Sequence, residues 1–219
     1  MGGVQTPTVV SVNLAVVRTD AFTRYKSGRS GIDKRPADGP VRLEVDGVAG
    51  DTVCDIRHHG GPEQAVYAYA TEDLDFWATE VGRPVGPGNV GENLTLRGVD
   101  CSHAVVGERW RVGEAVLRVT APRTPCRVFA GWWDVPDLIK RFFAAGRPGA
   151  YLAVERPAAV CAGDAVTVLD RPAHGVTVAD LMALTAGRRE LLPRVVAARD
   201  DLGPRGRELL DALVASTRS

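Results

Sequence analysis

The sequence has little of several features that would assign the protein to a specialised class. Its 219 residues carry 27 basic and 27 acidic side chains, so the formal net charge is zero, whereas a nucleic-acid-binding protein normally carries a basic excess. No apolar run approaches the roughly 20 residues that cross a bilayer. No basic segment followed by an apolar one marks a signal peptide. We therefore expect a cytoplasmic protein that binds neither nucleic acid nor a membrane.

Cysteines are also few, and none are paired at the spacing of a metal knuckle. The four are Cys54, Cys101, Cys126 and Cys161. In a cytoplasmic chain, cysteines scattered in this way are expected to be free thiols rather than disulfides. An apolar content of 45% and a charged content of 25% are ordinary for a soluble globular protein with a core. The length allows one large domain and a small one.

Short strand patterns dominate the first 170 residues. β-branched runs and alternating apolar residues predict strands, and Gly113-Glu114 lies between two of them as a hairpin turn would. The expected strands are residues 9–17, 41–45, 64–70, 110–112, 115–119, 150–154 and 165–169, with another directly after Asn93. Many short strands with few helices favour a mainly β, α+β fold built on a closed or nearly closed β-barrel.

Two amphipathic helices are expected beside these strands. Thr71 is expected to cap the first helix, with Glu72 and Asp73 in its first turn. Apolar residues at helical spacing give each helix one face that packs on the core. These residues are Leu74, Trp77, Ala78 and Val81 in the first helix, and Val135, Leu138, Ile139, Phe142 and Phe143 in the second.

The pattern changes after Pro172, where three short helices are predicted. We therefore divide the chain into a β-barrel domain, residues 1–172, and a three-helix domain, residues 173–219. Thr177 and Asp180 form a capping box at the start of the first helix. Pro204 occupies the tolerated first position of the third helix. Because so small a unit needs a partner for its apolar faces, we expect it to pack on the barrel or on a second subunit in a homodimer.

The segment Thr124-Pro125-Cys126 combines a thiol with features that expose it. Prolines end a strand, because proline cannot donate to the ladder. Cys126 also lies between Arg123 and Arg127. A cysteine at a strand end with cationic neighbours can be held as the thiolate, which is the nucleophile and the ligand of soft metals. The alternative is a small buried hydrophobic residue, as free cysteines often are.

A second candidate site lies upstream, in Asp55-Ile-Arg-His-His-Gly-Gly-Pro62. Gly60 and Gly61 let backbone N–H groups approach a ligand closely and form an anion-binding nest. Arg57, His58 and His59 add donors, so this turn suits a phosphate or another anion. Two alternatives are a solvated turn with no ligand and a zinc site using Cys54 with one of the histidines.

Two further loops have the composition of ligand-binding segments. Residues 26–34 combine glycines with Lys26, Arg29 and hydroxyl groups, a composition that can bind phosphate or form a surface loop. Residues 88–94 place Glu92 and Asn93 just before a strand. These two side chains can recognise the polar edge of a heterocycle, and the alternative is ordinary turn chemistry.

These segments occur together in an order that resembles a known family. The order is Ser30-Gly-Ile-Asp-Lys34, Val48-Ala-Gly-Asp51, residues 55–69, Gly91-Glu-Asn-Leu94, Pro122-Arg-Thr-Pro-Cys126 and Gly163-Asp164. It resembles the MOSC domain, named for the C-terminal part of molybdenum cofactor sulfurase, and most closely its YiiM-like bacterial branch. The tail from Val176 resembles the three-helix domain that follows MOSC in that branch.

The resemblance implies a fold, a cofactor and an activity. It implies a barrel-like β domain that binds the pterin-based molybdenum cofactor, with Cys126 as the protein ligand to molybdenum and the catalytic residue. It also implies reduction of N-hydroxylated compounds such as purine bases. Electrons would come from a separate flavin or iron–sulfur reductase, because this chain has no motif for either group. The candidate contacts to the cofactor are Cys126, Lys26, Arg29, Arg57, His58, His59, Gly60, Gly61, Asn93 and Arg123.

Substrate and role stay open at this point. Some relatives have an aromatic residue and a lysine directly after the cysteine, whereas this chain has Arg127-Val128-Phe129, so the resemblance does not identify the substrate. One alternative function is a non-catalytic carrier of the cofactor or of sulfur, which needs Cys126 but no substrate pocket. Another is a module that binds a small molecule through its basic loops without a metal.

Overall fold

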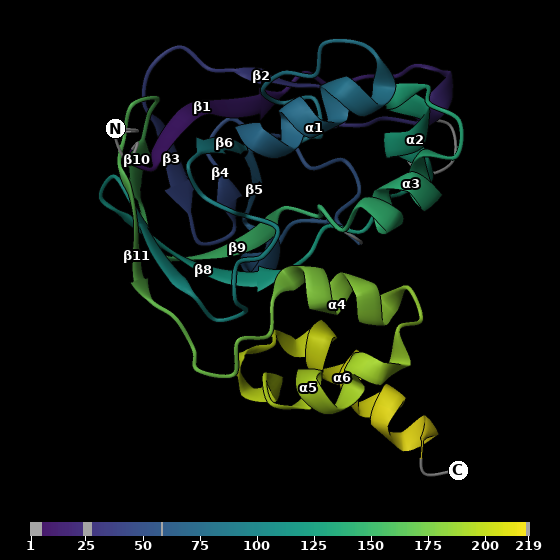
Figure 1. The fold of residues 1–219 in the computed structure, drawn as a ribbon. Helices are drawn as coiled ribbons and strands as arrows, with labels where there is room; N and C mark the ends of the chain where they lie inside the picture. The colour runs from purple at the N-terminus through teal and green to yellow at the C-terminus, as the bar shows by residue number, and fades with distance from the viewer. Residues whose placement is uncertain (1–5, 24–27, 58, 218–219) are drawn as a thin grey trace, which may run out of the picture.

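The computed structural model describes residues 6–23, 28–57 and 59–217, which form an α+β fold (Figure 1). The strands occupy the first three quarters of the chain, with helices beside them, and a group of helices follows at the C-terminal end. No helix within these residues has the length and apolar character needed to cross a membrane.

The described strands form an eight-stranded sheet and a three-stranded sheet. The order in the larger sheet is β11-β7-β8-β9-β5-β6-β1-β2, and in the smaller β10-β3-β4. Only β5 and β6 pair in parallel among these described strands, and α1 connects them. The strands are β1 (Thr8–Ala15), β2 (Lys34–Pro36), β3 (Val41–Glu44), β4 (Gly47–Val48), β5 (Val66–Ala70), β6 (Leu94–Arg97), β7 (Arg109–Val112), β8 (Ala115–Ala121), β9 (Ala150–Arg156), β10 (Ala158–Val160) and β11 (Val166–Asp170).

The expectation of a closed barrel is wrong, because both sheets are open. The edge strands of the larger sheet, β2 and β11, approach opposite ends of β1 rather than each other. β2 pairs with Asn13–Ala15. The start of β11 meets β1 through the isolated bridge between Thr8 and Ala165. Three backbone hydrogen bonds join Pro7 and Val9 to residues 163–166 there, but β1 and β11 form no ladder, so the eight-stranded sheet stays open.

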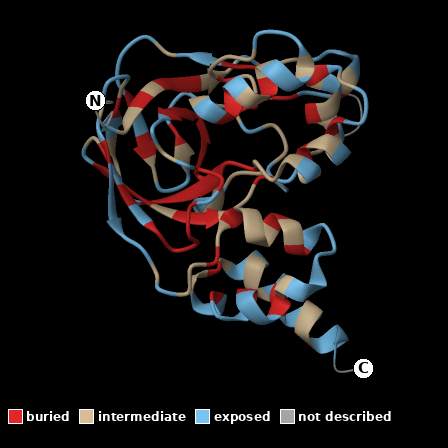
Figure 2. Ribbon diagram, in the orientation of Figure 1, coloured by how far each residue is buried: buried red, intermediate tan, exposed pale blue. Residues whose placement is uncertain are grey.

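Both faces of the central strands are buried, against two different clusters of side chains (Figure 2). Along β5, Val66, Ala68 and Ala70 face the main aliphatic core. Tyr67 and Tyr69 alternate with them and face a second, largely aromatic cluster. This alternation follows from the two-residue period of a strand. Because each face packs against a cluster, the strand predicted over residues 64–70 shows no polar face in the sequence.

Three helices cover the aromatic cluster: α1 (Thr71–Val81), α2 (Arg127–Trp133) and α3 (Leu138–Ala145). The ring of Trp77 in α1 stacks on that of Phe142 in α3, with ring centres 5.6 Å apart. The predicted cap at Thr71 is wrong: Ala70 occupies the cap position, and the Thr71 hydroxyl donates to Glu72. Helix α2 was not predicted, and Val135 precedes α3 instead of belonging to it.

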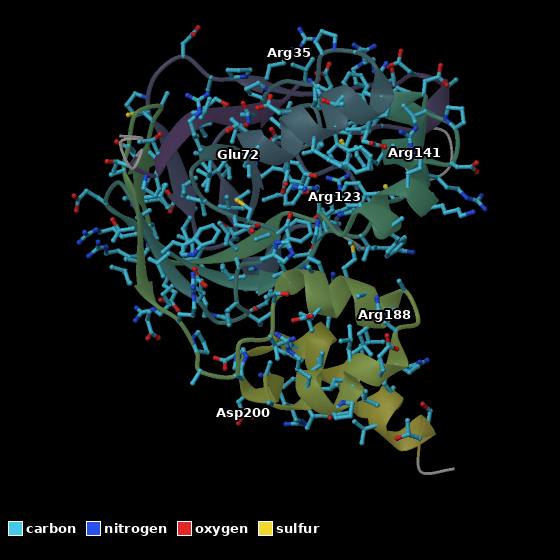
Figure 3. The ribbon with its side chains drawn as sticks, viewed as in Figure 1. Arg35, Glu72, Arg123, Arg141, Arg188 and Asp200 are labelled. Carbon is cyan, nitrogen blue, oxygen red and sulfur yellow. The ribbon has the colours of Figure 1, made fainter. Side chains whose placement is uncertain are left out.

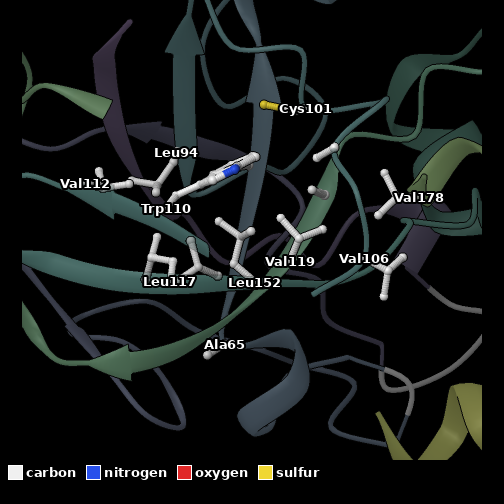
Figure 4. Packing of buried hydrophobic residues seen from close by; sticks show 14 of the residues in the cluster. Ala65, Leu94, Cys101, Val106, Trp110, Val112, Leu117, Val119, Leu152 and Val178 are labelled. Atoms are coloured by element: carbon white, nitrogen blue, oxygen red, sulfur yellow. The ribbon is translucent and has the colours of Figure 1, made fainter. Parts of the chain in front are cut away.

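The predicted tail helices are present, with short 3₁₀ turns between them. Thr177 and Asp180 form both hydrogen bonds of the capping box. Val178 at the start of α4 belongs to the same aliphatic cluster as Val106 and Val119 (Figure 4). The helices are α4 (Val178–Thr185), α5 (Leu192–Val196) and α6 (Pro204–Ser216), and the 3₁₀ turns of the chain are η1 (Ala21–Thr23), η2 (Pro62–Gln64), η3 (Arg189–Leu191) and η4 (Arg199–Asp201).

Candidate functional site

A cavity of about 580 Å³ opens beside β5 and β9. Its walls come from the segments around residues 29–34, 44–55 and 59–67, together with Gly91, Asn93 and residues 123–128. The volume falls in the range of small-molecule and cofactor sites, roughly 300–1,000 Å³. Of the ten candidate contacts to the cofactor, six line this cavity: Arg29, His59, Gly60, Asn93, Arg123 and Cys126.

Cys126 lies at a corner between a strand and a helix. β8 ends at Ala121, the prolines follow, and Cys126 has the extended dihedral angles φ −128° and ψ 170° directly before α2. Its thiol is free and half-buried, so it reaches the cavity while the backbone on both sides is fixed. The strand end was predicted from the prolines, whereas the helix that follows it was not.

Arg123, labelled in Figure 3, is a buried cation, and it is close enough to the Cys126 thiol for the two to interact electrostatically. Its guanidinium donates to the carbonyl of Val90 at 2.7 Å and lies over the rings of Tyr67 and Phe129. Within the described residues its Nε has no hydrogen-bond partner and no carboxylate pairs with it. Burial lowers the pKa of Arg123, but Tyr151, Tyr67 and the Cys126 thiol raise it more, so it stays charged.

A buried ion pair forms another part of the wall. Lys34 donates to Asp51, and the Asp51 carboxylate also accepts from the amide of Asn93 at 2.8 Å and from the backbone of Ala15. Burial lowers the pKa of Lys34 despite Asp51. Burial raises the pKa of the Asp51 carboxyl, but Lys34 and Asn93 lower it more. Asp51 thus favours the charged form of Lys34, and burial opposes it.

The structure brings Lys34, Asp51 and Tyr151 into the site, and residue patterns had not singled them out. Lys34 and Asp51 end two of the motifs that carried the family resemblance, which was the available signal. Asn93 was expected at the polar edge of a heterocycle, but its amide oxygen accepts from the N–H of Tyr67 at 3.2 Å. Its amide nitrogen donates to Asp51, so this side chain fixes the wall of the cavity.

A histidine and a tyrosine form a polar pair in the lining of the cavity. The Nδ1 atom of His59 lies 3.3 Å from the Tyr151 hydroxyl. Burial raises the pKa of Tyr151, although Arg123 opposes the rise. The phenol is consequently protonated at neutral pH and can donate a hydrogen bond.

The remaining predicted residues are not gathered at this cavity. Gly61 lines a neighbouring cavity instead, and the exposed Arg57 lines neither. Glu92 is fully buried and accepts from the backbone of Gly88 and Val90, which is the turn-chemistry alternative. Lys26 and His58 lie outside the described residues.

The zinc alternative gains no support. Across residues 6–23, 28–57 and 59–217, no group of three or more histidine, cysteine or carboxylate side chains is arranged to hold a metal ion. The four cysteines are all free thiols, as expected.

Comparisons with known proteins agree with the motif order. The sequence profile of the MOSC domain matches residues 55–167. The uncharacterized protein YflK of Bacillus subtilis is 34% identical over 170 residues, which cover 78% of this chain and 76% of that protein. The protein YiiM of Escherichia coli is 31% identical over 173 residues, covering 77% and 76% of the two chains.

Solved structures show the same fold. YiiM of Geobacillus stearothermophilus superimposes with a TM-score of 0.78 at 24% identity, over 94% of this chain and 98% of that one. YiiM of Escherichia coli gives a TM-score of 0.70 at 26% identity, over 84% and 89% of the two chains. The profile match, the sequence relatives and the shared fold together establish that the chain belongs to the MOSC domain family and is YiiM-like.

Proposed function

We propose that the protein is a molybdenum-cofactor-dependent reductase of N-hydroxylated compounds. In this proposal Cys126 is the protein ligand to molybdenum and the catalytic residue. A soft thiolate is the ligand type that such a metal favours. When bound, the cofactor supplies two-electron redox chemistry at the molybdenum.

The buried guanidinium of Arg123 is the observation that carries the proposal. Within the described residues this charge has no carboxylate partner, and its Nε has no hydrogen bond. An unpaired buried charge is strongly destabilising. An anionic group in the cavity beside Cys126 would neutralise it, and the phosphate-bearing pterin cofactor is such an anion. The residues present therefore fit the group that the family implies.

Other charged side chains of the cavity would position the anion beside Arg123. Arg29 and Arg127 line the same space and add positive charge. Lys34 is fixed by Asp51, so it offers its remaining ammonium protons from a defined position. Glu44 and Asp46 also line the cavity, and their negative charge would direct an anion toward the side of Arg123.

The His59 and Tyr151 pair would hold a proton for the reaction. Reducing an N–OH group to N–H consumes two electrons and two protons and releases water. The Tyr151 hydroxyl is protonated at neutral pH and hydrogen-bonds to His59 Nδ1. A proton given up at the tyrosine oxygen can be replaced from the imidazole, so the pair can relay protons into the cavity.

Electrons would come from a separate flavin or iron–sulfur reductase. A protein of Gibberella moniliformis named "Reductase" is 33% identical over 149 residues, which is 65% of this chain but only 26% of that protein. The matched part of that protein is thus a fraction of a longer chain. Its name supports the proposal at the level of oxidoreductase chemistry and does not supply a substrate.

Metal analysis of Cys126→Ser in a cofactor-producing host tests the proposal. We expect the parent protein to contain molybdenum and pterin, and to reduce N6-hydroxyadenine with an artificial electron donor. The variant should stay folded and lose both metal and turnover, because a hydroxyl is a hard and weakly acidic ligand. Cys161→Ser is the matched control, since Cys161 is a half-buried thiol outside the cavity.

The same measurements separate this proposal from its alternatives. A carrier would bind molybdenum through Cys126 without reducing the substrate. A module without a metal would contain no molybdenum in the parent protein. Full metal content and full turnover in Cys126→Ser would overturn the assignment of the ligand.

A further inference from the structure

A second cavity of about 490 Å³ lies next to the first, between the tail helices and the end of β8. Its walls differ in chemistry from those of the Cys126 cavity. Six leucines line one side: Leu181, Leu184, Leu202, Leu209, Leu210 and Leu213. The opposite side includes Pro62, Ala121, Pro122 and Thr124. Such a mostly apolar cleft with a few polar groups is typical of a site for a neutral organic molecule.

The two cavities share part of their walls. Gly60 and Gln64 line both. Thr124, which lines the second cavity, is two residues from Cys126, which lines the first. The two cavities are therefore adjacent at Gly60 and Gln64, where a molecule with its reacting group beside Cys126 would have to pass to extend into the leucine-lined space.

Gln64 is the polar group at this junction. Its Oε1 atom is buried and has no hydrogen-bond partner among the described residues. The backbone around it is fixed, since the Gln64 N–H donates to Gly61 and the neighbouring Glu63 carbonyl accepts from Thr120. An unpaired buried amide oxygen is unfavourable. If the Gln64 side chain rotates toward a ligand, its Oε1 atom can accept a hydrogen bond from a ligand N–H, and this bond would favour binding.

The charged groups that line the second cavity are either paired or exposed to solvent. The Glu63 carboxylate pairs with Arg118 at 3.1 Å. Arg205, the cation among the lining residues, is exposed and donates to the backbone carbonyl of Arg57. This cavity thus lacks the unpaired buried cation of the first one, and its chemistry favours an uncharged, apolar ligand.

We infer that the second cavity binds the apolar body of the substrate, whose N-hydroxyl group lies in the first. The ligand class is an N-hydroxylated base or amidine that carries a ring or alkyl substituent and offers an N–H to Gln64. The assignment of this ligand class rests on the proposed function. The tail helices would then form the substrate-binding wall of the protein.

Equilibrium binding of two probes to the whole protein tests this inference. The probes are N6-hydroxyadenine and its 9-benzyl derivative, titrated by calorimetry into protein from a cofactor-producing host. We expect the benzyl compound to bind about tenfold more tightly, the lower end of what an apolar pocket contributes for added hydrocarbon. No gain from the benzyl group would overturn the inference.

Filling the cavity should remove this gain. Leu209 is 45% exposed at the rim, so Leu209→Trp can place an indole in the cavity without disturbing the core. We expect the variant to bind the benzyl compound about tenfold more weakly and the unsubstituted base as before. Thr185→Trp, from the exposed end of α4 in the same lining, provides a second filled variant in case the first misfolds.

Val196→Trp is the matched control, because Val196 is 42% exposed on the tail but does not line the cavity. It should keep the benzyl preference, and loss of that preference in the control as well would overturn the inference. Gln64→Leu should weaken both probes, since it removes the amide and keeps the approximate size.

Turnover of the same probes separates the two proposals. Binding that depends on the second cavity, without any reduction, would support the cavity assignment and overturn the reductase proposal. Reduction of the probes that is unchanged by substitution of Leu209, Thr185 or Gln64 would support the reductase proposal and overturn the assignment of the second cavity.

Discussion

The guanidinium of Arg123 lies 4.8 Å from the centre of the Phe129 ring. These residues flank Cys126 on its two sides, one in the proline-rich segment and one in α2. Phe129 is fully buried among the aromatic residues, and Arg123 is bonded to the Val90 carbonyl. The contact therefore fixes the corner at which the thiol emerges and places a cation beside it.

Arg123→Met should remove the anion site while leaving the fold intact. Methionine can fill the space between the rings, and removing a buried charge without a carboxylate partner is often neutral or stabilising. We expect molybdenum content to fall about tenfold or more, as a lost charge pair of at least 1.4 kcal/mol implies. The free energy of unfolding of the cofactor-free protein, measured with urea, should rise or fall by no more than about 1 kcal/mol, the value of the lost bond to Val90.

Arg118→Met is the control for charge alone. Arg118 pairs with Glu63 outside the Cys126 cavity, so its replacement should leave metal content unchanged. Retention of full metal content in Arg123→Met would show that the anion contact lies elsewhere.

The sequence predicted what depends on local chemistry. Prolines before Cys126 indicated a strand end, and Thr177 with Asp180 indicated a helix start; both are present. The alternation around Gly113 predicted the β7–β8 hairpin, which the pairing of Val112 with Ala115 confirms.

What the sequence missed depends on partners far along the chain. Helix α2 has seven residues with Gly131 inside it, and its two tryptophans, Trp132 and Trp133, both donate to the carbonyl of Asn89. Hydrophobic periodicity in the sequence cannot reveal hydrogen bonds to a residue more than 40 positions away. Likewise, Lys34 was expected only as the end of the candidate binding loop 26–34, and its partner Asp51, 17 residues along the chain, could not be predicted from local sequence. Barrel closure failed as a prediction because it depends on strand register, which composition does not determine.

Gly61→Ala should lower stability, because the backbone there needs glycine. Gly61 has φ 80° and ψ 172°, a region that side-chain-bearing residues occupy at a cost of about 1–3 kcal/mol. Thermal unfolding should detect this as a drop of about 2–4 °C for each kcal/mol in a chain of this size. Metal content should persist in the folded fraction, since Gly61 does not line the Cys126 cavity.

Gly146→Asn offers a matched comparison. Gly146 also has a positive φ, but its angles of 65° and 26° are those of a left-handed helix cap, which asparagine tolerates. This variant should melt close to the parent. Equal losses in the two variants would contradict the assignment of strain to Gly61.

Deleting the chain after Pro172 should expose apolar surface and lower solubility. The tail is joined to the sheet region by backbone hydrogen bonds, in which Val106 donates to Val176 and Val178 donates to Ala104. Val178 also packs in the core cluster of the sheet. We expect aggregation or a changed mass in size-exclusion chromatography. A truncated protein that stays soluble, with the melting temperature and oligomeric state of the full-length parent, would show that the tail is independent.

Glu92 should make the protein less stable as the pH rises through the neutral range. Burial raises the pKa of this carboxyl from 4.5 to about 7, although bonds from Gly88, Thr95 and Val90 oppose the rise. The folded state therefore binds more protons than the unfolded state between these values, so stability is highest below the unfolded pKa and falls until the folded pKa is passed. The full change is about 3 kcal/mol.

Urea unfolding of the parent and Glu92→Gln at pH 5, 6, 7 and 8 measures this change in stability. The variant lacks this ionisation, so its free energy of unfolding relative to the parent should rise from pH 5 to about pH 7 and level off by pH 8. A constant difference between the two proteins across this range would show that Glu92 does not titrate there.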